Sequence, residues 1–414
     1  MSNEESILIP QTKLRVFAVV LFSIFGMIVS TLIMSISANY LTRLEFTILG
    51  SLLAILYSSS VLSGLIQTRS MTSKLNKKSS TDNWVMESFQ HSPWYRSVFY
   101  FALIFSAAIT VIAAFITPFG EEFMFELLLF WMVSFLSIAS APFLGRYQAN
   151  GRVTEYFAIG AFSTLLRLCL VWISFALGFG ISAYLLIFGL ATLFTAYVCG
   201  RKSRDMDWEL GSIQKSHLLP LGITVLLAIF FQLDLILSSK VLSPFDAGTY
   251  VVASQMSKMV TLIALSASLT LLPAVMKSQL ESTESISYYR KSISISLVMS
   301  SGLAMLGYIL SNPIINLVFG SQFTESSATF VYLVPGTITW SIFLTQINLE
   351  VFVLKLSTLP FLLLLGCLQL FLFSVSSSPE RYAISWSLSG AFAVLFFSLL
   401  RRRIGNRLSI SKDL

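Results

Sequence analysis

Runs of about twenty apolar residues recur along the whole of this 414-residue chain, and they constrain its fold more than any other feature. A run of that length crosses a hydrocarbon layer of about 30 Å as an α-helix. A helix also satisfies its own backbone hydrogen bonds, which lipid cannot do. Charged residues make up 11% of the chain, against about 25% in soluble proteins. We therefore predict an all-α integral membrane protein without a soluble domain.

The apolar runs predict about twelve membrane-spanning helices. The first run is long and has no small-residue cleavage site, so we interpret it as a retained helix and not as a signal peptide. The three cysteines are too scattered for a disulfide framework or a metal site. The approximate limits of the predicted spans are 15–38, 45–66, 97–117, 123–145, 155–177, 181–200, 219–238, 248–272, 291–311, 327–349, 356–375 and 382–400.

The basic residues lie mostly on one side of these spans. If the N-terminus is cytoplasmic and the spans alternate, 22 of the 27 Lys and Arg residues fall in cytoplasmic segments. The other five are Arg43, Lys240 and Arg381 outside and Arg167 and Lys258 within the membrane. This asymmetry is the positive-inside rule, and it predicts that both termini are cytoplasmic. The location of the basic residues also explains the net charge of +7: we expect the lipid bilayer as the partner, and no nucleic acid.

Two short sequence matches recur half a chain apart. The segment 41–45 (LTRLE) opens the second span, and 242–246 (LSPFD) opens the eighth; likewise 94–96 (WYR) and 288–290 (YYR) precede the third and ninth. The offsets of 201 and 194 residues predict a six-span unit that is duplicated once, in parallel orientation. We therefore predict two six-helix lobes, residues 1–205 and 206–414. Transporters built from such repeats bind substrates near the bilayer midplane.

Arg167 and Lys258 are cations near the middle of predicted spans, one in each lobe. At 1.5 Å per residue they lie roughly 18 Å and 15 Å deep. A charge at that depth costs about 2.5–3.5 kcal/mol on insertion scales, and it marks either a transport pathway or a buried partner. With a single acid at comparable depth, Asp234, the two cations predict a water-filled cavity for an anion. We favour a cavity role for Lys258, whereas both interpretations stay open for Arg167.

Small and hydroxylated residues share the helix face of Lys258, among them Ser254 and Thr261. We predict that both line the cavity, although such stripes also serve helix packing in membranes. Asp234 has two interpretations: a structural partner of Lys258 or Arg167, or a carboxylate that binds a coupling proton or sodium ion. Gly26, in the first span, is the predicted hinge.

The sequence contains no GxxxxGK[ST] phosphate loop, no HExxH motif, no Ser-His-Asp set and no acidic metal cluster. We therefore expect no cofactor and no metal, and we do not expect an enzyme. A membrane enzyme of glycan assembly would need a sizeable loop with acids and bases, and the short outward loops argue against it. It remains an alternative, as does a cation-coupled drug or small-molecule antiporter.

Three stretches resemble the polysaccharide and O-antigen flippases of the multidrug/oligosaccharidyl-lipid/polysaccharide exporter superfamily. The first runs from Pro142 through Arg152 to Arg167, the second from Asp234 through Tyr250 to Pro273, and the third from Phe319 to Gly336. Lipid II flippases, a neighbouring group, carry extra C-terminal spans and basic residues in the first span. This chain has neither, so peptidoglycan export is not expected.

The resemblance implies two six-helix bundles that form a V around a central cavity lined by spans 1, 2, 7 and 8. A polyprenyl-diphosphate-linked oligosaccharide would cross the plasma (inner) membrane by alternating access, for O-antigen, capsule or exopolysaccharide. Lys258 would face the diphosphate, Arg167 would lie further back, and Asp234 would balance charge or couple an ion. Other membrane proteins of polysaccharide assembly are implied as further partners.

Overall fold

The computed structural model describes residues 21–22, 25–26, 28–79, 94–116, 124–149, 152–202, 215–269, 283–350 and 359–410. Throughout these residues the regular structure is helical, and no β-strand occurs among them. Each of the twelve predicted spans is helical over almost all of its described residues. The all-α prediction is confirmed. The chain forms two compact units, Met1–Gln232 and Leu233–Leu414.

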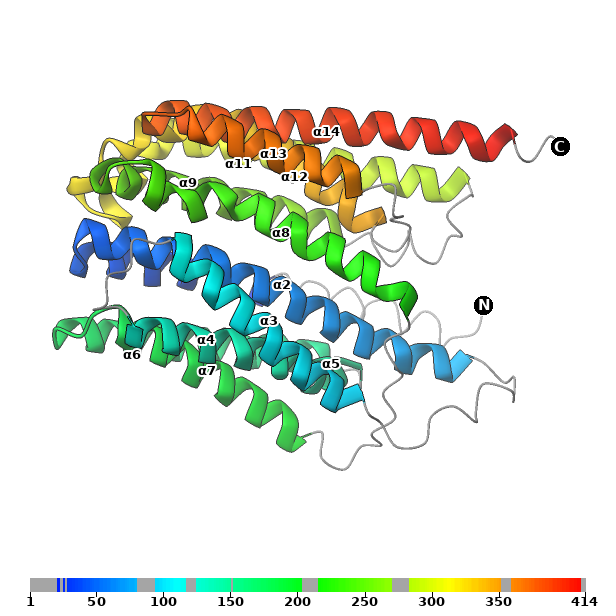
Figure 1. Ribbon diagram of the computed structural model, residues 1–414, viewed down its shortest axis with the longest axis horizontal. Helices are drawn as coiled ribbons and strands as arrows, with labels where there is room; N and C mark the ends of the chain where they lie inside the picture. The colour runs from blue at the N-terminus through cyan, green and yellow to red at the C-terminus, as the bar shows by residue number, and fades with distance from the viewer. Residues whose placement is uncertain are drawn as a thin grey trace, which may run out of the picture. The chain divides into compact units, whose positions relative to one another are not determined.

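Unit 1 contains the helices of the first six predicted spans. Its central helix is α4, which packs against α2, α3 and α7, while α6 packs against α7 (Figure 1). The helices are Ile28–Tyr40, α2 (Arg43–Ser79), α3 (Trp94–Ile116), α4 (Met124–Ala139), α5 (Ala141–Ala149), α6 (Val153–Ala176), α7 (Ile181–Lys202) and the first part of α8 (Lys215–Val241).

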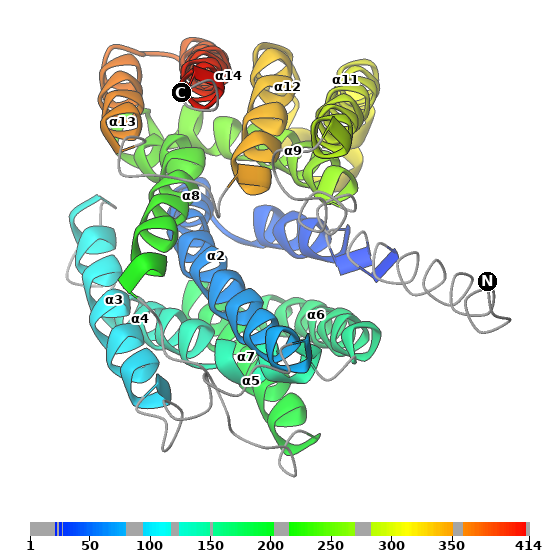
Figure 2. The same cartoon turned by 90° about the vertical axis from the view of Figure 1, so that its right-hand side faces the viewer.

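Unit 2 contains the end of α8 and the remaining helices. Seen end-on, α13, α14, α12 and α11 lie in a row, and α9 packs across α11 and α12 (Figure 2). The elements are α9 (Pro244–Leu269), α11 (Thr283–Val318), the short 3-10 helix η3 (Ser321–Phe323), α12 (Ser326–Glu350), α13 (Leu359–Ser374) and α14 (Pro379–Ile410).

The two units share one packing pattern, as the repeat predicts. In each, the fourth span contacts the second, third and sixth, and the sixth contacts the fifth. The matching sequence segments begin α2 and α9 with the same cap: the hydroxyl of Thr42 bonds to Glu45 Oε2 at 2.7 Å, and that of Ser243 to Asp246 Oδ2 at 2.7 Å. Such caps satisfy backbone donors that a helix start leaves open. The sequence similarity between the two units is therefore retained at positions where the same helix cap is needed.

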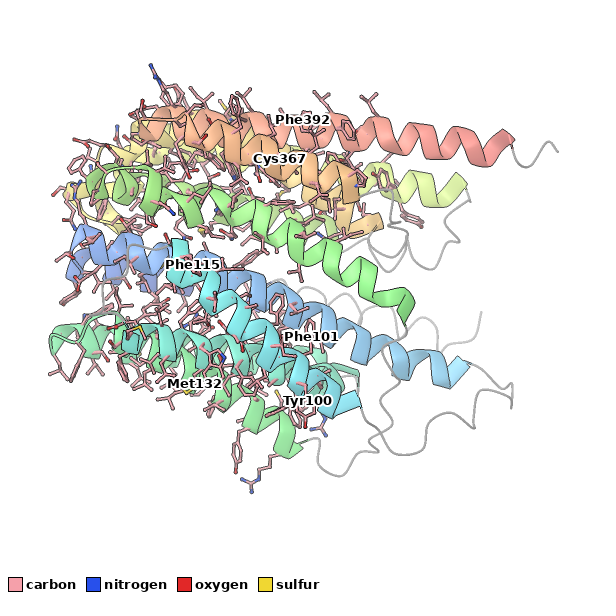
Figure 3. The ribbon with its side chains drawn as sticks, in the orientation of Figure 1. Tyr100, Phe101, Phe115, Met132, Cys367 and Phe392 are labelled. Carbon is pink, nitrogen blue, oxygen red and sulfur yellow. The ribbon has the colours of Figure 1, made fainter. Side chains whose placement is uncertain are left out.

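The surface of the helices suits lipid. Seven of the described helices are long and apolar enough to cross a membrane. On α3, the side chains of Tyr100, Phe101 and Phe115 are exposed (Figure 3). Soluble monomers rarely expose apolar patches of more than a few hundred Å². The chain is a multi-pass membrane protein, and its predicted orientation stays a prediction.

The fourth predicted span, 123–145, is two helices and not one. The helix α4 ends at Ala139, Ser140 forms a turn, and α5 begins at Ala141. Pro142 has no N–H to donate to the preceding turn. The hydroxyl of Ser140 donates to the carbonyl of Ser137 at 3.1 Å, and the N–H of Phe143 donates to the carbonyl of Ser140 at 3.1 Å. The break therefore places Ser140 at the junction of α4 and α5.

The helix α8 contributes to both units. Its residue Val225 packs in one apolar cluster with Leu62 and Ile138 of unit 1. The units accordingly divide between Gln232 and Leu233, within α8, whereas the predicted lobe boundary at 205/206 precedes this helix. Asp234 consequently belongs with unit 2.

Tight packing fixes α14 against α12. The rings of Trp340 and Trp386 stack with centroids 5.9 Å apart, and each lies against a glycine of the opposite helix. A Cβ at Gly336 would lie 2.5 Å from Trp386 Cε3, and one at Gly390 would lie 2.7 Å from Trp340 Cδ1. Pro335 lies inside an uninterrupted α12. The α12–α14 contact sets the position of the α14 residues that reach the candidate site.

Candidate functional site

A buried ion pair joins α8 and α9. Lys258 Nζ donates to Asp234 Oδ1 at 2.7 Å, and the two side chains are 4% and 0% exposed. Tyr250 and Ser254 donate their hydroxyls to Asp234 Oδ2 at 2.8 Å and 2.9 Å. These three donors lie four residues apart along α9, so they share one helix face. One face of α9 thus presents three donors to a single carboxylate.

Tyr382, at the start of α14, completes this cluster. Its hydroxyl donates to the backbone carbonyl of Asp234 at 3.0 Å. Its ring meets that of Tyr250 edge-on at 4.8 Å and stacks on Phe373 at 4.5 Å. Three helices therefore converge on Asp234, and the charges of the pair cancel. Removing one partner of such a buried pair is strongly destabilising, because the other charge is then uncompensated.

Thr261 lies one turn beyond Lys258, where α9 contacts α12. Its hydroxyl donates to the carbonyl of Ser257 at 3.1 Å and lies 3.4 Å from the carbonyl of Thr337. The hydroxyls of Ser257 and Thr337 bond to each other at 2.6 Å. Hydroxyl contacts of this kind join helices in membranes. The geometry at Thr261 therefore matches the packing alternative.

Arg167 lies in unit 1, on α6, in a different environment. Its Nη2 lies 3.5 Å from Ser30 Oγ, and its guanidinium lies over the ring of Phe188, 4.6 Å from the centroid. Its Nε is buried without a hydrogen-bond partner. Among the residues that the structure describes, no carboxylate forms an ion pair with Arg167. Its charge is therefore not neutralised within the described part of unit 1.

Arg167 lines a cavity of about 350 Å³ between α2, α4, α5, α6 and α7. Among the described residues it is the one charged member of the lining, which otherwise consists mainly of hydroxyl-bearing side chains, including Ser63, Ser137, Ser163 and Thr192. A guanidinium offers five N–H donors in a planar fork that matches phosphate and carboxylate. The cavity thus combines an available cation with polar walls.

The structure brings together three of the predicted site residues: Lys258, Asp234 and Ser254. Sequence reasoning left open which cation pairs with Asp234, and the structure pairs it with Lys258. A Cβ at Gly26 would meet no atom within 4 Å, so nothing in its surroundings requires glycine. Tyr382 was missed, because no pattern links it to Asp234, 148 residues away. Pro273 lies outside the described residues.

No group of three or more His, Cys, Asp or Glu side chains that could hold a metal ion occurs in the described ranges.

No protein-family model and no curated protein matches the sequence. Solved structures do match. A lipid II flippase, MurJ in an inward closed conformation, superposes with a TM-score of 0.68 at 15% identity, over 92% of this chain and 87% of the other.

Two further structures are described as members of the MOP superfamily. An inward-facing multidrug resistance MATE family transporter matches with a TM-score of 0.64 at 13% identity, over 94% of this chain and 98% of that one. A transporter from Pyrococcus furiosus is described as having a binding pocket of reverse polarity. It matches with a TM-score of 0.59 at 13% identity, over 94% of this chain and 95% of that one. The chain has the fold of the MOP-superfamily transporters.

The MOP fold confirms the fold class and agrees with the fold that the resemblance implies. Identities of 13–15% carry the likeness no further than the fold. Flippases and drug transporters both share this fold, so the substrate class must be argued from the site. Within the MOP fold of this chain, the two membrane cations differ: Lys258 is paired and Arg167 faces a polar cavity.

Proposed function

We propose that this protein is a flippase that moves a polyprenyl-diphosphate-linked oligosaccharide across the plasma membrane for surface polysaccharide biosynthesis. It works by alternating access. The transporter fold supports transport in general, and the cavity at Arg167 supports an anionic substrate. That cavity is the observation that carries the proposal.

Arg167 suits a diphosphate because its donors are available. A cation at membrane depth without a counter-charge costs about 2.5–3.5 kcal/mol on insertion scales, and such residues usually serve a pathway. The ring of Phe188 offsets part of this cost, because a cation over an aromatic face gains roughly 0.5–2 kcal/mol. An anion that entered the cavity would gain a charge-assisted contact with the guanidinium. A cationic drug would be repelled there.

Lys258 is a weaker candidate for the diphosphate than the sequence indicates. To bind it, Lys258 would have to leave Asp234, and separating a buried pair costs about 3–5 kcal/mol. We therefore assign Arg167 as the substrate ligand and Lys258, Asp234 and Ser254 as a cluster that fixes α8 on α9. A proton or sodium gradient is the proposed energy source, and no bound cofactor is required.

The test is mass spectrometry of lipid-linked oligosaccharides in a strain that lacks the protein. The strain is complemented with wild type, Arg167→Ala, or Arg381→Ala, which removes an equal charge from an exposed position at the start of α14. A complete repeat unit on its polyprenyl carrier should accumulate without the protein. Wild type and Arg381→Ala should relieve the accumulation. Arg167→Ala should not, because a charge-assisted hydrogen bond contributes about 1.5–3 kcal/mol, or roughly 10- to 100-fold in binding.

Other outcomes identify the alternatives. A truncated glycan in the deletion strain would indicate a membrane enzyme of glycan assembly. Unchanged glycans together with a new sensitivity to cationic drugs would indicate a cation-coupled antiporter. Export by folded Arg167→Ala at the wild-type rate would refute the assignment of Arg167.

A further inference from the structure

A second cavity, of about 230 Å³, lies beside the one that contains Arg167. Its walls come from α3, α4, α5 and α7 and are mainly apolar, with three phenylalanines: Phe99, Phe135 and Phe143. The rings of Phe99 and Phe135 meet edge-on with centroids 5.2 Å apart. None of the described residues that line this cavity is charged. It offers an apolar chain a place to bury its surface.

Two residues, Ser140 and Thr192, line both cavities. Ser140 forms the turn between α4 and α5, and Thr192 comes from α7. The hydroxyl of Ser140 bonds to the carbonyl of Ser137, and that of Thr192 to the carbonyl of Phe188 at 3.0 Å. Both side chains are small, and both hydroxyls bond within their own segment. A polar cavity with a cation and an apolar cavity therefore meet at a wall of two small residues.

The apolar cavity reaches the outer surface of the helices. Phe99 and Leu193, on its rim, are 42% and 43% exposed. On the neighbouring surface of α3 the large side chains of Tyr100 and Phe101 are also exposed (Figure 3), as suits contact with lipid. A chain dissolved in the bilayer could therefore enter this cavity sideways, without crossing a polar surface.

We propose that the two cavities form one site for the substrate lipid. The diphosphate lies at Arg167, and the first isoprene units lie between Phe99, Phe135 and Phe143. This inference rests on the proposed function and deepens it, because it places both ends of the substrate in unit 1. The charge of Arg167 selects a phosphate, and the adjoining apolar cavity, open to lipid, selects a molecule whose phosphate carries a hydrocarbon chain.

Binding to the purified full-length protein in nanodiscs tests the proposal with three probes: a polyprenyl diphosphate, inorganic pyrophosphate and the uncharged polyprenol. Thr192→Leu fills the shared wall and should weaken binding of the polyprenyl diphosphate at least tenfold, with a smaller effect on pyrophosphate, which needs only the Arg167 side of that wall. Phe99→Ala should weaken binding of the polyprenyl diphosphate and the polyprenol about tenfold. Arg167→Gln should weaken binding of both diphosphates and spare the polyprenol.

Phe101→Ala is the matched control, because Phe101 lies on the same helix, is 38% exposed and does not line the cavity. It should bind all three probes as wild type does. Elution volume and melting temperature identify any variant that fails to fold, and Phe99→Ala, at an exposed rim position, is the variant least expected to do so. Unchanged affinity of folded Phe99→Ala and Thr192→Leu for the polyprenyl diphosphate would overturn the proposal.

Two comparisons separate this inference from the function on which it rests. If Phe99→Ala and Thr192→Leu bind normally while Arg167→Ala still blocks export, the tail site is wrong and the flippase proposal stands. If the deletion strain accumulates no lipid-linked glycan, the function itself fails. Equal competition by a diacyl phosphatidic acid would overturn the isoprenoid assignment and indicate a general site for anionic lipids.

Discussion

Neutralising Asp234 alone should destabilise unit 2 more than neutralising Asp234 and Lys258 together. Asp234→Asn keeps the shape but leaves Lys258, 4% exposed, without the carboxylate that lies 2.7 Å away. Loss of one partner of a buried pair costs about 3–5 kcal/mol. Lys258→Met should cost less, because Tyr250 and Ser254 still donate to the remaining carboxylate. The double variant should lie within about 1 kcal/mol of wild type, since replacing a whole buried pair is often neutral.

Thermal unfolding in detergent, followed by tryptophan fluorescence, measures the stability of wild type, the two single variants and the double variant, which together form a double-mutant cycle. Trp340 and Trp386 are fully buried in unit 2 and report on its packing. For a unit of this size, 1 kcal/mol shifts the melting temperature by roughly 2–4 °C. Asp234→Asn should therefore lower it by about 6–20 °C. Asp246→Asn, at the exposed start of α9, is the control and should lower it by roughly 2–4 °C.

A double variant as unstable as Asp234→Asn would refute the reasoning, because the loss could then not come from an uncompensated lysine. The coupling energy of the cycle should instead be about 3 kcal/mol or more, which is large for two residues in contact. Export by the folded double variant also distinguishes the two interpretations of Asp234. A structural pair leaves export intact, whereas a carboxylate that binds a coupling ion does not.

Two further predictions concern packing and the repeat, and chemical denaturation measures both. Gly390→Ala should lower the stability of unit 2 by about 1–3 kcal/mol, because its Cβ would lie 2.7 Å from Trp340 Cδ1. Gly302→Ala is the control: its Cβ would have no atom within 4 Å, so the change should be neutral or slightly stabilising. Thr42→Ala and Ser243→Ala should each cost about 1 kcal/mol, because both remove the same cap from equivalent helices; a loss at one position only would contradict that equivalence.

Lipid made the fold predictable from the sequence. Because a spanning segment must be helical and about twenty residues long, apolar length alone located the helices. The repeat was visible at 41–45 and 242–246 because both segments cap a helix, and capping restricts residue choice more than contact with lipid does. The break at Ser140 was not predicted, because a proline in an apolar run is tolerated within many membrane helices, as Pro335 is in α12.

The candidate site was predictable only in part, because helical spacing gives the face of a residue and not its partner. The spacing placed Ser254 on the same face of α9 as Lys258, and both side chains contact Asp234. Nothing in the spacing says that α14 would bring Tyr382 to the carbonyl of Asp234. The pairing of Asp234 with Lys258 likewise depends on how α8 packs against α9, which is a tertiary contact.

The buried ion pair of unit 2 has no counterpart at the equivalent positions of unit 1. At the offset of 201 residues, the positions equivalent to Asp234 and Lys258 are Ile33 and Tyr57 in unit 1. Ile33 is fully buried, and Tyr57 packs near the ring of Phe231 at 6.2 Å. Both members of the pair are therefore missing together, as expected where neither buried charge is tolerated without the other.

Arg167 follows a different rule. In the part of unit 1 that the structure describes, its charge faces a cavity of about 350 Å³ and no carboxylate. Lys258 is tolerated because Asp234 lies 2.7 Å away, whereas Arg167 is tolerated because polar space lies beside it. These two situations give the same signal in a sequence, a basic residue in mid-span. Only the packing of the helices separates them, and on that basis we propose Arg167 as the cation that meets a substrate.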